Sequence, residues 1–194
     1  MHQHGCTAQM CYLSVVSSRQ RTFIRLKAYI YTSIHSLDEE KTIMGKYFGT
    51  DGFRGEAGIT LTADHAYKVG RFLGWYYNAL REHNGDNNPA RIVIGKDTRR
   101  SSYMFEYSLV AGLTASGADA YLLHVTTTPS VAYIARVDDF DCGIMISASH
   151  NPYYDNGIKL IDCYGEKMPE EILLLVEDYI DGKLHVFDKD WPEL

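Results

Sequence analysis

From residue 62 onward, the sequence alternates between segments with helical spacing of apolar residues and short runs rich in β-branched residues. Helical spacing occurs in residues 62–83, 101–116, 129–137 and 169–180. Strand-like runs occupy residues 91–95, 118–124, 142–147 and 157–162. Short strands that alternate with helices of about 10–20 residues predict an α/β fold, in which helices cover both faces of one sheet.

The composition is typical of a globular protein and excludes several other classes. Hydrophobic residues make up 45% of the chain and charged residues 23%, and the net charge of -6 gives no support for a nucleic-acid partner. No apolar run approaches the roughly 20 residues that a membrane span needs. The four cysteines are too few and too dispersed for a disulfide scaffold, which favours a reducing, cytoplasmic location.

Charge and periodicity divide the chain near residue 43. Residues 1–43 carry a net charge of +2 and lack clear periodicity, whereas residues 44–194 carry -8 and contain all of the periodic segments. We therefore expect residues 1–43 to be an extension that is either not native or disordered, and residues 44–194 to form the domain. The alternative is that the first 43 residues bind a partner.

Two polar segments are candidates for binding phosphate. Residues 49–55 contain three glycines, which permit close backbone approach, and Arg54, whose guanidinium suits phosphate. The alternative is a tight turn with a solvated arginine. Residues 95–102 follow a predicted strand, but Ala90 occupies the place of the first P-loop glycine, so a nucleotide P-loop is rejected. This segment is interpreted as a helix start, capped by Ser101 or Ser102, with Asp97 paired to an arginine.

A third polar segment, residues 147–152, presents serines beyond the end of an apolar strand. A serine in this place can act as a nucleophile or a phosphoryl carrier if a base or a positive charge is near, and His150 and Lys159 are candidates. The segment lacks the G-x-S-x-G pattern of a hydrolase. The alternative is that its serines satisfy only the backbone of the loop.

A turn signal at residues 155–157 precedes the strand that carries Lys159. Side chains alternate between the two faces of a strand, so Lys159 is expected opposite Ile158 and Leu160. Most lysines in such positions are solvated. This one follows the serine segment closely enough for its ammonium group to reach a phosphate on Ser149.

Taken together, the segments GTDGFRG (49–55), GKDTR (95–99), ISASHNP (146–152) and NGIK (156–159) resemble those of the α-D-phosphohexomutase superfamily. The opening MGKYFGT (44–50) is most similar to that of the bacterial phosphoglucosamine mutases, and the resemblance extends over residues 44–190. It implies a three-layer α/β/α sandwich with a mixed, mostly parallel sheet, which is the first domain of the phosphohexomutase fold.

The resemblance also implies a phosphoserine enzyme that interconverts glucosamine 6-phosphate and glucosamine 1-phosphate, on the route to cell-wall precursors. Ser149 matches the phosphorylated serine, and a sugar 1,6-bisphosphate is the intermediate and activator. Arg54 and Lys159 match positively charged residues at the reaction centre, with Lys159 a candidate proton carrier. His150 matches the histidine beside the nucleophile, and Thr50 is assigned to phosphate binding. Mg2+ is expected to bind partly through the phosphate on Ser149.

The chain departs from the family pattern in its length. Family members have four domains, and the D-G-D-x-D-R metal loop and domains 2–4 have no counterpart in this sequence. We therefore expect the chain alone to have negligible mutase turnover. Domains 2–4 of the full-length enzyme are its expected partners. Alternatives are a phosphomannomutase or phosphoglucomutase fragment, or a non-catalytic module that binds sugar phosphate or a partner. A hydrolase based on Ser149 and His150 is least favoured, because no oriented acid partner is identifiable.

Overall fold

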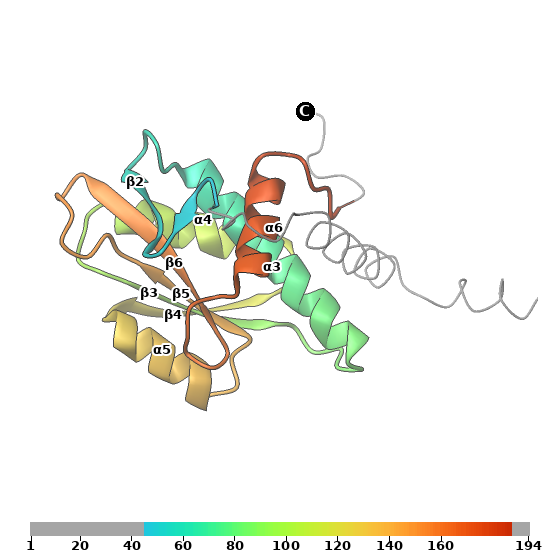
Figure 1. Ribbon diagram of the computed structural model, residues 1–194. Helices are drawn as coiled ribbons and strands as arrows, with labels where there is room; N and C mark the ends of the chain where they lie inside the picture. The colour runs from blue at the N-terminus through green and yellow to red at the C-terminus, as the bar shows by residue number, and fades with distance from the viewer. Residues whose placement is uncertain (1–44, 188–194) are drawn as a thin grey trace, which may run out of the picture.

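A mixed β-sheet forms the centre of the domain in the computed structural model, which describes residues 45–187 (Figure 1). The six strands within this range are β1 (Phe48–Gly49), β2 (Gly52–Glu56), β3 (Arg91–Lys96), β4 (Asp119–Val125), β5 (Cys142–Ile146) and β6 (Asp155–Asp162). The helices within it are α3 (Ala63–His83), α4 (Ser102–Ala115), α5 (Thr128–Val137) and α6 (Glu170–Ile180). None of these helices is long and apolar enough to span a membrane.

The order of strands across the sheet is β1-β2-β6-β5-β3-β4. β3 pairs in parallel with both β4 and β5, whereas β5–β6, β6–β2 and β2–β1 are antiparallel. β2, β3, β4 and β5 consequently point in one direction. The carboxyl ends of β3 and β5 meet at the same edge, where the chain turns back from β5 into β6.

Helices cover both faces of this sheet, which confirms the predicted three-layer sandwich (Figure 1). On one face, Val131 and Ala135 of α5 pack against Val93, Met145 and Ile161. On the other face, α3, α4 and α6 bury a larger apolar core against alternate strand residues. The strands that lie in the middle of the sheet are apolar on both sides, as expected for strands between two helical layers.

The two longest helices, α3 and α4, approach each other at glycines. A side chain at Gly112 would meet the carbonyl oxygen of Tyr67, and one at Gly70 would meet the carbonyl oxygen of Leu109. These two glycines therefore let the helix backbones come into direct contact.

A carboxylate on α6 binds the start of the domain. Glu177 is 6% exposed, and its side chain accepts hydrogen bonds from the backbone N–H groups of Lys46, Tyr47 and Phe48 at 2.6, 2.8 and 2.7 Å. One turn later, Asp181 accepts hydrogen bonds from Lys46 Nζ and the Tyr47 hydroxyl, both at 2.7 Å. The segment before β1 is thus attached to α6 through charged hydrogen bonds.

The predicted helices and strands are present, with ends that differ by one or two residues. Thr62 caps the start of α3, since its Oγ1 accepts a hydrogen bond from His65 N. Residues 49–55, expected as a loop, instead contain the end of β1 and most of β2, because Phe53 packs into the core and pairs with Ile158. The turn expected at residues 155–157 is the beginning of β6. The predicted boundary between residues 43 and 44 lies outside the described residues and stays a prediction.

We predict that Glu177→Gln lowers the free energy of unfolding by about 2–3 kcal/mol, because hydrogen bonds to a buried charged group are lost or weakened. Urea denaturation measures this change. Glu170→Gln is the matched control on the same helix, since Glu170 is 43% exposed in a surface ion pair with Lys167 and should contribute less than about 1 kcal/mol. Equal effects of the two substitutions would contradict the role of Glu177.

The contribution of Asp181 should depend on pH. Hydrogen bonds from Lys46 and then Tyr47 hold the pKa of the Asp181 carboxyl well below its ordinary value of 3.8. A carboxyl with a lowered pKa in the folded state stabilises the fold above its unfolded pKa, and this stabilisation is lost as the pH falls through the folded pKa. Urea titrations should therefore show Asp181→Asn less stable than the unaltered chain at neutral pH, with the difference shrinking below pH 3.8. A difference independent of pH would refute this account.

Candidate active site

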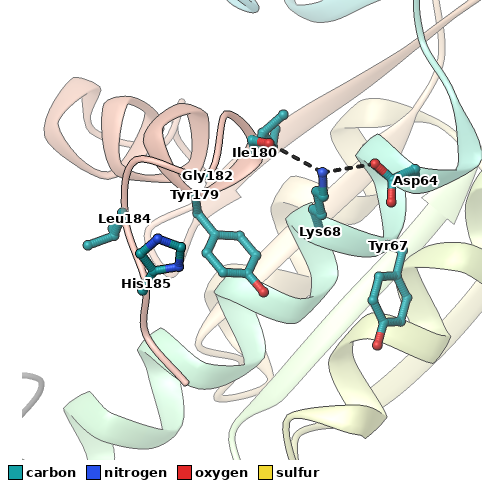
Figure 2. A pocket seen from close by; sticks show the side chains of 8 residues that line it. All are labelled: Asp64, Tyr67, Lys68, Tyr179, Ile180, Gly182, Leu184 and His185. Carbon is teal, nitrogen blue, oxygen red and sulfur yellow. Dashed lines mark hydrogen bonds and ion pairs between the residues drawn. The ribbon is translucent and has the colours of Figure 1, made fainter. Parts of the chain in front are cut away.

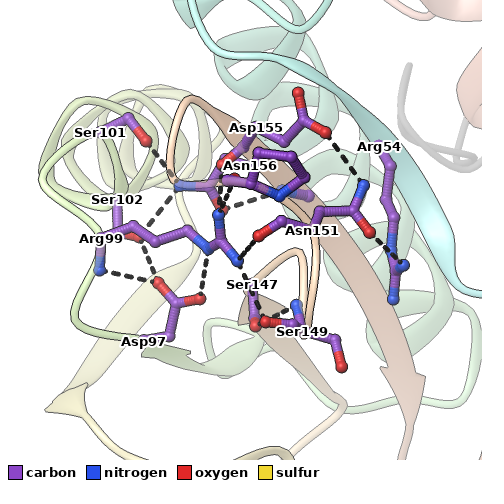
Figure 3. A network of polar contacts seen from close by, with 12 residues as sticks. Arg54, Asp97, Arg99, Ser101, Ser102, Ser147, Ser149, Asn151, Asp155 and Asn156 are labelled. Atoms are coloured by element: carbon purple, nitrogen blue, oxygen red, sulfur yellow. Dashed lines mark hydrogen bonds and ion pairs between the residues drawn. The ribbon is translucent and has the colours of Figure 1, made fainter.

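The loop between β5 and β6, residues 147–154, holds Ser149 in a defined backbone conformation (Figure 3). Ser149 is exposed and has a φ of 54°, a left-handed conformation that costs a residue other than glycine about 1–2 kcal/mol. Its N–H donates to Ser147 Oγ at 3.0 Å, and its carbonyl accepts from Arg99 Nη2 at 3.0 Å. Its hydroxyl makes no hydrogen bond within residues 45–187 and points away from the network. The backbone is held while the hydroxyl stays available.

Arg99 is the main connection between this loop and the rest of the domain. Besides the carbonyl of Ser149, its guanidinium donates to the carbonyl oxygens of Asn151 at 2.8 Å and Asp155 at 3.0 Å. It also donates to the carbonyl of Pro152. Three backbone carbonyls from the loop and one from the first residue of β6 thus converge on one side chain.

Asp97 orients Arg99. Its Oδ2 accepts from Arg99 Nε at 3.0 Å, and its Oδ1 accepts from Arg99 N at 3.0 Å and from Ser102 Oγ at 2.9 Å. The N–H of Asp97 donates to the carbonyl of Ile146, the last residue of β5, at 2.9 Å. The predicted pairing of Asp97 with an arginine is confirmed, and it joins the loop after β3 to the strand before the serine.

Asn156, the second residue of β6, makes a further connection to the start of α4. It is fully buried, and its Nδ2 donates to Ser101 Oγ at 2.9 Å and to Ser102 Oγ at 3.0 Å. Ser101 occupies the N-cap position of α4, as predicted, but its side chain makes no capping hydrogen bond, and Ser102 lies inside the helix. Their hydroxyls bind the amide of Asn156 instead.

Arg54 lies on β2 and reaches the serine loop from the neighbouring strand. Its Nη1 donates to Asn151 Oδ1 at 3.2 Å, and its Nη2 lies 3.6 Å from Asp51 Oδ2. Its Nε is buried without a hydrogen-bond partner in the described part of the chain. Asn151 in turn donates through Nδ2 to Asp155 Oδ2 at 3.0 Å. The Arg54 guanidinium is consequently held beside the loop, and its Nε–H is a hydrogen-bond donor that is not used within the described residues.

Lys159 projects from the same face of the sheet as Arg54. Arg54 pairs with Gly157 across β2 and β6, and Lys159 is two residues further along β6. Ile158 and Leu160 are buried in the larger core, which confirms the predicted alternation. Lys159 is half-buried, and among residues 45–187 its ammonium group has no hydrogen bond or ion pair.

Two predicted site residues are less constrained than these cations. His150 follows Ser149 and is exposed, and Thr50 is exposed in the turn between β1 and β2. Within the described residues, no hydrogen bond connects either side chain to Ser149. Arg54 reaches the serine loop through Asn151, and Lys159 lies opposite Met145 near the end of the strand that precedes this loop. The roles of Ser149, Arg54, Lys159, His150 and Thr50 stay predictions.

The described residues do not form a metal site by themselves. No group of three or more His, Cys, Asp or Glu side chains suited to a metal ion occurs within residues 45–187. The carboxylates next to the loop are already bound: Asp51 lies near Arg54, Asp97 binds Arg99, and Asp155 accepts from Asn151. A phosphate on Ser149 would add a single ligand, so we assign no reaction step to a metal held by this part of the chain.

A buried ion pair lies beneath the loop after β3. Lys96 Nζ is 2.7 Å from Glu106 Oε2, and the two side chains are 1% and 0% exposed. The ammonium lies 3.1 Å from the centroid of the Tyr103 ring, and His124 Nδ1 lies 3.5 Å from Glu106 Oε1. The sequence pattern does not predict this pair, because Lys96 falls in a segment that was expected to be a polar loop. A charged residue among the apolar positions of α4 was the signal, because a buried charge needs a partner.

A hollow of about 340 Å³ lies elsewhere, between α3 and the end of α6 (Figure 2). Lys68 lies on its wall, where its ammonium donates to the carbonyl of Ile180 at 3.3 Å and pairs with Asp64 at 3.0 Å. The hollow is lined by Asp64, Tyr67, Lys68, Tyr179, Ile180, Gly182, Leu184 and His185. None of these belongs to the serine loop or to the strands that carry Arg54 and Lys159.

Comparison with known families gives a match over most of the described range. The profile described as "Phosphoglucomutase/phosphomannomutase, alpha/beta/alpha domain I" matches residues 45–185. Similar solved structures include a phosphoglucomutase/phosphomannomutase family protein from Burkholderia thailandensis, with a TM-score of 0.58 and 27% identity over 71% of this chain and 30% of that one. A putative phosphomannomutase from Thermus thermophilus has a TM-score of 0.55 and 26% identity over 72% of this chain and 30% of that one.

Curated relatives are similar at much higher identity. A phosphoglucosamine mutase from Lachnospira eligens is 75% identical over 141 residues, which is 73% of this chain and 30% of that protein. One from Lachnoclostridium phytofermentans is 70% identical over the same shares of the two chains. The chain thus spans 30% of the length of these relatives.

We predict that Glu106→Leu lowers the free energy of unfolding by about 3–5 kcal/mol, because it leaves the Lys96 ammonium buried and unpaired. The double variant Lys96→Met/Glu106→Leu removes both charges and should recover most of that loss. Urea denaturation of the two variants and the unaltered chain tests this. A double variant as unstable as the single one would show that the unpaired charge is not the cause.

Proposed function

Because the chain belongs to the phosphoglucomutase/phosphomannomutase family, with residues 45–185 as its α/β/α domain I, we propose that it carries the phosphoserine of a phosphoglucosamine mutase. The observation that carries the proposal is the serine loop, where the N–H and carbonyl of Ser149 are bound, its hydroxyl has no hydrogen bond in the described range, and Arg54 reaches the loop through Asn151. The identities of 75% and 70% to proteins named phosphoglucosamine mutase favour glucosamine phosphate as the substrate.

In the proposed reaction, the phosphoryl group on Ser149 passes to a free hydroxyl of glucosamine 1-phosphate or 6-phosphate. The bond between phosphorus and Ser149 Oγ breaks as the bond to the sugar oxygen forms, and a bisphosphate results. The sugar hydroxyl loses its proton to a base, and Ser149 Oγ takes up a proton. The bisphosphate then reorients, and Ser149 accepts its other phosphoryl group. The product sugar therefore carries its phosphate on the other of the two positions, C1 or C6.

The cations on β2 and β6 have the charge that this transfer needs. Phosphoryl transfer is accelerated mainly by positioning and by neutralising the negative charge of the phosphoryl oxygens. Arg54 offers a guanidinium with an unbound Nε, and Lys159 offers an ammonium group without a partner in the described range. We assign phosphate binding to both, with Thr50 as a further contact. Lys159 or His150 is the proposed proton carrier.

By itself, this chain is expected to carry out only part of the mutase reaction. Since it spans 30% of its curated relatives, we propose that it accepts a phosphoryl group but does not turn over substrate without the sequence that corresponds to the remainder. Mg2+, a sugar 1,6-bisphosphate activator and a cytoplasmic location belong to the same proposal. A mutase assay with Mg2+ and bisphosphate that gave normal turnover would refute this limit.

A phosphomannomutase or phosphoglucomutase is the second candidate, favoured by the names of the two similar solved structures. Their identities of 27% and 26% are far below those of the phosphoglucosamine mutases, so this candidate ranks lower. Parallel incubation with glucosamine, glucose and mannose 1,6-bisphosphates separates the two. Preferential transfer from the glucosamine compound supports the leading proposal.

We predict that glucosamine 1,6-bisphosphate with Mg2+ places one phosphate on the chain, at Ser149, as measured by intact mass and phosphopeptide mapping. Ser149→Ala should abolish this modification. Ser108→Ala is the control, because Ser108 lies on α4 and its hydroxyl is bound to the carbonyl of Met104. Phosphate on another serine would overturn the site, and an unmodified chain would contradict the proposed acceptance.

A further inference from the structure

We infer that Arg99 is a positioning residue for Ser149: it fixes the backbone of the serine loop so that the hydroxyl is presented to the phosphoryl group. The inference rests on the proposed function in taking Ser149 as the phosphoryl acceptor. Arg99 itself contacts no reacting atom. Its guanidinium binds the carbonyls of Ser149, Asn151, Pro152 and Asp155, and the Asp97 carboxylate (Figure 3).

Few other contacts hold the loop to the rest of the domain. Two hydrogen bonds lie within it, from Asn151 N to the carbonyl of Ala148 at 3.0 Å and from Asp155 N to the carbonyl of Pro152 at 3.1 Å. Arg54 reaches only the side chain of Asn151. At the far end of the loop, the carbonyl of Tyr154 accepts from Ala57 N at 3.0 Å. Within the described residues, the carbonyls of Ser149, Asn151 and Pro152 depend on Arg99 for their attachment outside the loop.

Because Ser149 has a positive φ, the attachment by Arg99 determines where its hydroxyl lies. A residue other than glycine keeps such a conformation only where its surroundings determine it. For Ser149 these surroundings are Ser147 Oγ on the N–H and Arg99 Nη2 on the carbonyl. If Arg99 is removed, the peptide after Ser149 is released, and the backbone can relax toward ordinary φ values with a shift of the hydroxyl.

The role requires a guanidinium rather than any positive charge. Asp97 binds Nε, which leaves Nη1 and Nη2 facing the loop, where Nη1 contacts Pro152 and Asp155 and Nη2 contacts Ser149 and Asn151. A lysine has three donors on one nitrogen and no planar fork. It keeps the charge but cannot bind both halves of the loop and Asp97 at once.

The test compares Arg99→Ala and Arg99→Lys with Arg100→Ala, the neighbouring exposed arginine, as control. In the full 194-residue chain, the rate of Ser149 phosphorylation from glucosamine 1,6-bisphosphate with Mg2+ is measured against donor concentration. A misplacement of about 1 Å costs roughly 100-fold in rate, so we expect a loss of that order in Arg99→Ala. The concentration of donor at half-maximal rate should change little.

Guanidinium ion at non-denaturing, millimolar concentration separates positioning from general stability. It should restore part of the rate in Arg99→Ala by occupying the vacated position, whereas it would further weaken a chain that was merely destabilised. Arg99→Lys should stay slow and Arg100→Ala should be as fast as the unaltered chain. If Arg99→Ala does not fold, the rate of Arg99→Lys decides, and a normal rate overturns the inference.

Amide hydrogen exchange distinguishes failure of this inference from failure of the proposed function. In Arg99→Ala, faster exchange confined to peptides that cover residues 147–157 supports the positioning role even if no variant takes up phosphate, in which case only the proposed function fails. Unchanged exchange in that loop, or an unchanged rate of phosphorylation, overturns the inference.

Discussion

The Arg99 guanidinium, oriented by Asp97, fastens the loop between β5 and β6 to the loop that follows β3. Because β3 and β5 are parallel neighbours, the two loops leave the same edge of the sheet and lie side by side. The chain then returns as β6, antiparallel to β5, which places Lys159 opposite Met145, near the end of the strand that precedes the serine loop. The parallel strands β3 and β5 thus place the two loops next to each other, and the antiparallel strand β6 carries the cation Lys159.

Charged side chains inside the domain are placed where elements distant in sequence must be joined. Glu177 binds the backbone N–H groups before β1, and the pair of Lys96 and Glu106 joins β3 to α4. Each charge is buried and has a charged or hydrogen-bonding partner, as is required when it is removed from water.

The phosphoryl transfer proposed for this end of the sheet requires a backbone that is held in place and side chains that are available for reaction. The backbone on both sides of Ser149 is bound, whereas the hydroxyl of Ser149 and the ammonium group of Lys159 have no hydrogen bond or ion pair in the described region. A reaction that relies on positioning and on neutralising charge suits such an arrangement. The relatives are more than three times as long as the matched segment, so the proposed turnover draws on groups beyond this domain.

The sequence alone determined the fold class, most helix and strand positions, and the serine loop, because these depend on local periodicity and on a compact motif. The position of Lys159 opposite Ile158 and Leu160 follows from the same kind of short-range rule. The strand at 52–56 was missed, since its glycines indicate a turn until Phe53 finds its place beside Ile158.

Only the tertiary structure decided which polar residues act together. Arg99 and Ser149 are 50 residues apart, and their contact exists because two parallel strands end at one edge. The partner of Lys96 was likewise hidden, because a helix and a strand had to pack before the two charges could meet. Periodicity specifies the face on which a side chain lies, but only packing across the sheet specifies what it touches.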